Sequence, residues 1–183
     1  TRAQLVDAAE RLLVDEGYAA VTSRKVAAAA GLKPQLVHYY FRTMDDLYVE
    51  VFRRRAEAQL ARFERAVADD VSLKVLWAMN ADAGAAAFTI EFVALANHRK
   101  SIRTEVARYA ERFRAAQLDA LGRALQRAGV EASQMPPVAA LLLMTGLSQV
   151  LALESALGVT AGHAETVAFV EAAVARLDGG ATR

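Results

Sequence analysis

The chain contains no cysteine and little glycine, proline or aromatic residue: 10 Gly, 3 Pro and 7% aromatics among 183 residues. Without cysteine it can form neither a disulfide framework nor a thiolate-ligated metal site. This usage fits a reducing compartment, and we expect the protein to be cytoplasmic. The scarcity of Gly and Pro, together with abundant alanine, favours helix throughout.

Signatures of catalysis are also missing. The three histidines, His38, His98 and His163, are far apart in the sequence and lack partners at metal-ligand spacing. The sequence contains no G-x-S-x-G elbow, no P-loop and no dinucleotide fingerprint. We therefore expect neither an enzyme nor a bound metal or cofactor.

The most apolar window is Val138–Leu153. It is shorter than the roughly 20 residues that span a bilayer. Thr145, Ser148 and Gln149 interrupt it. This pattern predicts a buried helix, and we expect no membrane partner.

Helical periodicity and the positions of Gly and Pro predict an all-α fold of about nine helices. Thr22 and Thr43 suit N-caps, with Asp46 as the capping-box partner of Thr43. Residues 179–183 should form a frayed tail. The expected helices cover residues 3–16, 23–30, 34–40, 44–67, 71–81, 83–97, 100–128, 136–157 and 162–177.

One segment departs from the near-zero net charge of +1. No Asp or Glu occurs from Gly17 to Met44, but this segment contains Arg24, Lys25, Lys33 and Arg42. Such a local positive surface favours nucleic acid as a partner, because neutralising phosphates releases counterions.

The same segment has the form of a helix-turn-helix, with two short helices joined by a turn at Gly31 and Leu32. Several apolar residues have the spacing to pack on the first helix: Val26, Ala27, Ala30, Leu32, Val37 and Phe41. If Val37 and Phe41 point inward, then Gln35, His38, Tyr39 and Arg42 face outward, with Leu36 at the edge of that face.

The chemistry of the outward face suits the major groove of double-stranded DNA. Glutamine can pair with adenine through two hydrogen bonds, lysine reaches guanine or phosphate, and leucine touches a thymine methyl group. Tyr and His suit phosphate contacts. The alternative is a solvated polar face, which leaves Leu36, Tyr39 and Tyr40 without a partner.

These residues carry a family resemblance. The runs Thr22–Ala27, Ala30–Leu32, Val37–Phe41 and Asp46-Leu47 resemble the tetracycline-repressor (TetR) family of bacterial transcription regulators, over about residues 3–55. The resemblance implies a dimeric, all-helical repressor with a ligand-binding C-terminal domain. It implies phosphate contacts from Thr22, Ser23, Tyr40 and the start of the helix at 44–67, and base-facing positions at Arg24, Lys33, Pro34, Gln35, Leu36 and Tyr39.

The sequence departs from the family pattern at three positions. His38 stands where the family most often has Tyr, and Met44 stands where a Lys usually meets the DNA backbone. Arg42 is a candidate for the role of that lysine. Gln35 replaces a common small residue, so the base preference should differ from that of typical members.

We expect residues 1–47 to form the helix-turn-helix domain and residues 48–183 to form a ligand-binding and dimerisation domain, with the helix at 44–67 linking the two. The helix at 136–157 is apolar on nearly every face, so it should be buried on every face, partly against a second copy. The expected dimer residues are Leu143, Val150, Leu151, Val167, Val170 and Val174.

Large apolar residues with interspersed polar groups suggest a pocket for a small, largely apolar effector. The candidates are Trp77, Asn80, Phe88, Phe92, Tyr109, Phe113, Met144, Leu147 and Ser148. An ordinary core with satisfied polar side chains is the alternative for each of them. The sequence thus predicts a homodimeric, ligand-responsive repressor of a palindromic operator. The alternatives are an activator and a ligand-independent architectural or adaptor protein.

Overall fold

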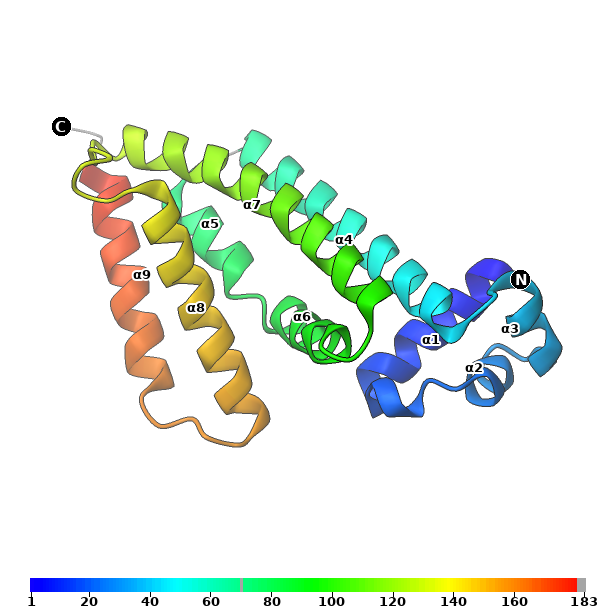
Figure 1. Ribbon diagram of the computed structural model, residues 1–183. Helices are drawn as coiled ribbons and strands as arrows, with labels where there is room; N and C mark the ends of the chain where they lie inside the picture. Colours follow the sequence, from blue (N-terminus) through cyan, green and yellow to red (C-terminus); the bar gives the residue numbers. More distant parts are fainter. Residues whose placement is uncertain (70, 181–183) are drawn as a thin grey trace. The chain divides into compact units, whose positions relative to one another are not determined.

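The computed structural model describes residues 1–69 and 71–180, and all regular structure within these ranges is helical (Figure 1). The expected all-α fold and its nine helices are confirmed. The bounds are α1 (Arg2–Glu16), α2 (Ser23–Ala29), α3 (Pro34–Tyr40), α4 (Met44–Asp69), α5 (Leu73–Asn80), α6 (Ala83–Ala96), α7 (Lys100–Arg127), α8 (Pro137–Ala156) and α9 (His163–Gly180). A short 3-10 turn, η1 (Tyr18–Ala20), was not foreseen.

Both expected N-caps are present. The Thr22 hydroxyl accepts a hydrogen bond from the backbone N–H of Lys25 at 3.3 Å. Thr43 and Asp46 form a reciprocal capping box, in which each side chain accepts from the other's backbone N–H, at 3.1 and 3.0 Å. These contacts satisfy amide groups that have no partner inside the helix, so they fix where α2 and α4 begin.

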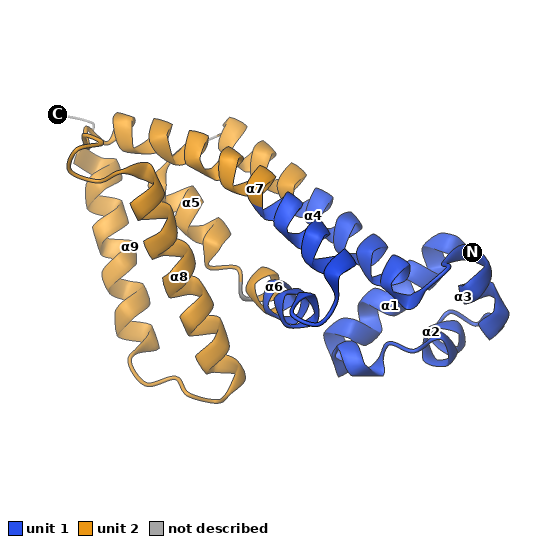
Figure 2. Ribbon diagram, in the orientation of Figure 1, with its two compact units in different colours: residues 1–59, 88–110 blue, residues 60–87, 111–183 orange. Residues whose placement is uncertain are grey.

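The chain forms two compact units, which Figure 2 colours blue and orange. Unit 1 comprises residues 1–59 and 88–110, and unit 2 comprises residues 60–87 and 111–183. Three helices, α4, α6 and α7, contribute residues to both units. The expected functional boundary at residue 47 stays a prediction, because these units describe packing.

Unit 1 contains the first three helices and a cluster of aromatic rings. Phe52 on α4 lies 5.0 Å from Phe92 and 5.6 Å from Tyr109, between ring centroids, and stacks on Phe88 at 6.2 Å. Phe88 and Phe92 are buried. Aromatic pairs at these separations add to the gain from burying their area. The second half of α6 and the start of α7 therefore share one core with the helix-turn-helix.

Unit 2 has a core of its own around Phe63, Leu76 and Leu121, all buried. Helix α8 buries only Ala140, Leu141 and Ser148, and α9 has no buried residue among those described. The expectation that α8 is buried on every face is therefore not met within one chain. By length and composition alone α8 could cross a membrane.

The C-terminal end differs from the expectation in one detail. Helix α9 continues through Gly180, so the first two residues of the expected tail are helical. Residues 181–183 lie outside the described residues.

Candidate DNA interface and effector cavities

Helices α2 and α3 are held at a fixed angle by a glycine turn and a shared core. Gly31 has φ 68°, and the N–H groups of Gly31 and Leu32 donate to the carbonyls of Ala28 and Ala27 at 3.1 and 2.9 Å. This is the Schellman pattern, in which a left-handed residue ends a helix, and glycine adopts that conformation most easily. Val26, Ala27, Val37 and Phe41 are buried as expected, and Ala30 and Leu32 pack against them.

All of the predicted DNA-binding residues are exposed or partly exposed at the surface. Tyr39 is the extreme case, with 78% of its area exposed and its ring edge-on to Tyr40 at 5.0 Å. Large exposed aromatic groups on a short helix mark a contact surface. The exposed members are Thr22, Arg24, Lys33, Pro34, Gln35, His38, Tyr39, Tyr40 and Arg42, and the half-buried members are Ser23 and Leu36.

The positive surface is narrower than the acid-free segment suggested. The Lys25 ammonium forms an ion pair with Glu16 at 2.6 Å, so the last acid before the gap folds back onto it. Arg24, Lys33 and Arg42 have no ion pair within the described part of the chain. Met44 packs partly buried against the unit 1 core, so it does not take the place of an exposed lysine.

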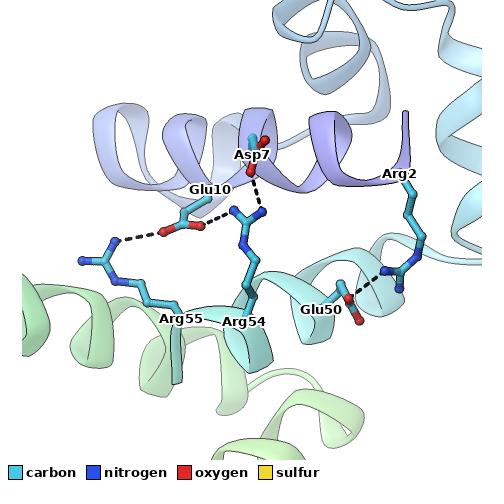
Figure 3. Close-up of polar contacts among 6 residues, drawn as sticks. All are labelled: Arg2, Asp7, Glu10, Glu50, Arg54 and Arg55. Atoms are coloured by element: carbon cyan, nitrogen blue, oxygen red, sulfur yellow. Dashed lines mark hydrogen bonds and ion pairs between the residues drawn. The ribbon is translucent and has the colours of Figure 1, made fainter. Parts of the chain in front are cut away.

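Ion pairs attach α1 to α4 (Figure 3). Arg2 pairs with Glu50 at 2.7 Å, and the hydrogen bond from Arg2 lowers the pKa of that carboxyl. Arg54 on α4 points at both Asp7 and Glu10 of α1, with 2.5 Å to Glu10, and Arg55 also reaches Glu10 at 3.1 Å. These arginines are therefore engaged within unit 1 and are not part of a free DNA-binding face.

Helix α4 is also attached to α7 within unit 1. Glu105, which is buried, accepts from Arg53 at 2.7 and 3.1 Å and from Arg108 at 2.5 Å. The hydrogen bond from Arg53, together with that from Arg108, lowers the pKa of Glu105 to about 2. At the start of α4, Asp45 accepts from Arg99 and from Ser101, the latter at 2.9 Å. The sequence alone gave no signal for these long-range pairs.

Unit 2 contains an apolar groove of about 340 Å³, formed by α5, the second half of α7, α8 and α9. Every lining residue is apolar, and Trp77 lies in its wall, 4% exposed. The lining residues are Leu73, Trp77, Leu121, Leu125, Met135, Ala140, Leu143, Met144, Leu147, Phe169, Val170, Ala173, Val174 and Leu177.

A second cavity of about 210 Å³, here called the polar cavity, lies in unit 2, and five of its ten lining residues have polar side chains set among apolar ones. Asn80 accepts from Thr145 at 3.2 Å, and its amide donates to the Leu76 carbonyl at 2.9 Å. His163 bonds Glu154 at 2.8 Å. The lining residues are Asn80, Ala81, Asp82, Ala86, Ser148, Leu151, Ala152, Ser155, His163 and Val167.

The nine predicted pocket residues fall into separate groups. Trp77, Met144 and Leu147 line the apolar groove, and Asn80 and Ser148 line the polar cavity. Phe88, Phe92 and Tyr109 lie in the ring cluster of unit 1, and Phe113 lies edge-on to Phe63 in unit 2, with ring centroids 5.2 Å apart.

The predicted dimer residues also divide. Leu143 and Val150 are exposed, by 70% and 50%, and Leu143 also lines the apolar groove. Leu151, Val167, Val170 and Val174 are half-buried and line the two cavities. The exposed apolar face of α8 and α9 instead comprises Leu142, Leu143, Val150, Leu153 and Phe169. Sequence reasoning missed Phe169, because the valine stripe on α9 drew attention to the inward face.

Known proteins match the N-terminal module in sequence and the whole chain in fold. The family described as "Bacterial regulatory proteins, tetR family" matches residues 5–51. The HTH-type transcriptional regulator BetI of Rhizobium meliloti (strain 1021) is 42% identical over 52 residues, which is 28% of this chain and only about a quarter (26%) of that relative's length.

Two solved structures share the fold. The transcriptional regulator FadR from Bacillus subtilis, solved with stearoyl-CoA, has a TM-score of 0.70 at 16% identity and covers 98% of this chain and 99% of its own. A transcriptional regulator from Saccharomonospora viridis, solved with choline, has a TM-score of 0.71 at 18% identity, covering 86% and 85%. At these identities the likeness establishes the fold alone.

Proposed function

We propose that this chain is a tetR-family protein and a ligand-responsive DNA-binding repressor of transcription rather than an enzyme, because its residues 5–51 match that family. The observation that carries the proposal is the exposed face of α3 and its flanks. That face presents Gln35, Tyr39 and Arg42 to solvent, on a helix whose other side is fixed by Val37 and Phe41. The proposed location is the cytoplasm, where a bacterial operator lies.

Several residues of this face and its flanks have a proposed role in DNA contact. Gln35 reads adenine through its amide, Lys33 reaches guanine or phosphate, and Leu36 contacts a thymine methyl group in the major groove. Thr22, Ser23, Tyr40 and Arg42 position the helix by contacting phosphates. Arg24, Lys33 and Arg42 are available for these contacts because they form no ion pair within the described residues.

The proposed active form is a homodimer on a palindromic operator. Two reading helices have to meet successive major grooves about 34–36 Å apart. The exposed apolar face of α8 and α9 supports dimerisation, because residues such as Leu143 and Phe169 are 70% and 69% exposed in the single chain. Two such helices from each copy can form an isologous four-helix interface.

The proposed effector is a small, largely apolar molecule that binds in unit 2 and weakens DNA binding. The apolar groove supports this, since its volume of about 340 Å³ lies in the range of ligand sites. The effector has to bind the released state more tightly than the DNA-bound state, or it shifts nothing. The ligands of the two fold relatives, stearoyl-CoA and choline, support small-molecule binding by this fold.

The test begins with genomic fragments selected by the purified protein and titrated by fluorescence anisotropy at several salt concentrations. A palindromic site with nanomolar affinity and a steep salt slope supports the proposal. Weak binding that is indifferent to sequence contradicts it.

A further inference from the structure

The apolar groove and the polar cavity of unit 2 are neighbours along one seam between α5, α8 and α9. On α5, Trp77 lines the groove, and Asn80, one turn later, lines the cavity. On α8, Leu147 lines the groove and Leu151 the cavity. On α9, which runs back beside α8, Val170 lines the groove and Val167 the cavity (Figure 1). One helical turn is about 5.4 Å, so the two spaces follow each other on all three helices.

We infer that the two cavities form one elongated site for an amphiphile with a hydrocarbon body and an uncharged hydrogen-bonding head. The body, a chain or a ring system, occupies the groove, and the head occupies the cavity. That such a molecule regulates DNA binding rests on the proposed function, whereas its binding in unit 2 does not.

The groove selects the body through the hydrophobic effect alone. Its lining offers no charged side chain, and its floor consists of core residues such as Leu121 and Leu125, 2% and 3% exposed. Burying a methylene group is worth about a fourfold gain in affinity until the groove is filled. Leu143 and Phe169 of its lining also belong to the exposed face proposed for the dimer, so a second copy is the competing occupant, which the experiment below distinguishes.

The cavity selects the head through hydrogen bonds. Ser148 is 7% exposed, and its hydroxyl donates to the Met144 carbonyl at 2.9 Å, which leaves its oxygen lone pairs to accept from a ligand. Ser155 and His163 also line the cavity, but they lie 3.4 Å from each other, between Oγ and Nδ1, and His163 bonds Glu154 as well. The Ser148 oxygen can therefore accept from the N–H or O–H of an amide or alcohol head.

Charge in the cavity argues against an ionic head. No Lys or Arg is among the described lining residues, and Asp82 is the acid in the wall. An anionic head would therefore lie beside the Asp82 carboxylate with no lining Lys or Arg to pair with it, which is costly. Asp82 is already paired with Arg62 at 2.8 Å, and nearby Glu154 is bonded to His163, so a cationic head also finds no free acid.

The single tryptophan makes this directly measurable, because Trp77 lies in the groove and no other residue shares its emission. The experiment titrates the purified chain without DNA at neutral pH with 1-octanol, 1-decanol, decanoate and decyltrimethylammonium, and follows Trp77 fluorescence. We expect saturable binding of 1-decanol, about 16-fold weaker binding of 1-octanol, and binding of decanoate and decyltrimethylammonium that is in each case at least about tenfold weaker than that of 1-decanol.

Two variants test the head compartment. Ser148→Ala and Asn80→Leu should each reduce the difference in affinity between 1-decanol and decanoate, mainly by weakening the binding of 1-decanol. Asn97→Leu, at an exposed position in unit 1, is the matched control and should leave all four affinities unchanged.

Three outcomes overturn the inference. Equal or tighter binding of decanoate or decyltrimethylammonium rules out the uncharged head. Insensitivity of 1-decanol binding to both variants separates the cavity from the site. If Trp77 fluorescence does not change with any of the four probes, the site is ruled out. Sedimentation as a dimer would then assign the groove to a second copy. None of these outcomes involves DNA, so each leaves the test of operator binding independent.

Discussion

The Tyr48 hydroxyl on α4 donates to the carbonyl oxygen of Val21, at 3.1 Å, one residue before the N-cap of α2. The same hydroxyl lies 2.9 Å from the carbonyl of Tyr18. Tyr48 is buried, burial raises its pKa, and the Arg99 guanidinium lies 5.5 Å from its ring centroid. The start of α4 therefore holds the connection between α1 and α2 in place.

Tyr48→Phe should lower the free energy of unfolding by about 1 kcal/mol, because two carbonyls lose their shared donor. Hydrogen exchange at the amides of residues 22–25 should become faster. Urea unfolding and exchange mass spectrometry measure the two effects. Tyr39→Phe is the control, since that exposed hydroxyl should change operator affinity but not stability. Unchanged exchange in Tyr48→Phe would remove this residue from the positioning of α2.

Gln35→Ala should relax the base preference at one position in each half-site, with a cost of about 1–3 kcal/mol for the preferred base. Arg42→Ala should weaken binding to all sequences alike and reduce the salt slope by about one. Selection of binding sites and anisotropy across salt distinguish the two. If Gln35→Ala kept the parent's sequence preference, the reading face assigned here would be wrong.

Acid should weaken unit 1 through Glu105. Its folded pKa of about 2 is below its ordinary value of 4.5, so its ion pairs contribute full stability above about pH 5 and lose it as the pH falls toward 2. Glu105→Gln should cost about 2 kcal/mol at neutral pH, reduced from the full shift because both arginines are half exposed. It should also flatten the pH dependence of urea unfolding in that window. An unaltered pH dependence would contradict this assignment.

Val150→Glu should break the proposed dimer without unfolding the chain, because Val150 is 50% exposed in the single subunit. Sedimentation velocity should show a monomer, and operator affinity should fall steeply with it. Ala94→Glu, an exposed change on α6 in unit 1, is the matched control. A dimer that persists in Val150→Glu would place the interface elsewhere. Leu147 is a less clean test, since it lines the groove.

Local signals in the sequence predicted well where the helices lie and which side chains of α3 face inward or outward. Thr22, Thr43 and Gly31 act within a few residues of their own position, so their capping and turn roles can be derived from spacing. The 3.6-residue period likewise placed Val37 and Phe41 inward and Gln35 outward. The ion pair between Lys25 and Glu16 was not predicted, because it depends on how the chain turns back after α1.

The cavities could not be predicted to the same degree, because periodicity identifies the apolar face of a helix but not its partner. Phe88 and Phe92 are, like Trp77, large apolar residues in a predicted helix, yet they pack on Phe52 in unit 1. The spacing of Val170 and Val174 predicted an outward-facing stripe for dimerisation, but both residues line the groove of unit 2. Such assignments depend on tertiary contacts between distant residues.

The chain crosses between the two units three times, within α4, α6 and α7. These crossings limit how segments of this protein can be exchanged with those of another protein. A segment cut after Gln59 would leave Phe52 without Phe88, Phe92 and Tyr109, and Arg53 without Glu105. An exchange of regulatory halves between two proteins of this design therefore has no single splice point. Residues 88–110 have to stay with the N-terminal segment, so the proposed reading face and the proposed effector site would be inherited as interleaved pieces.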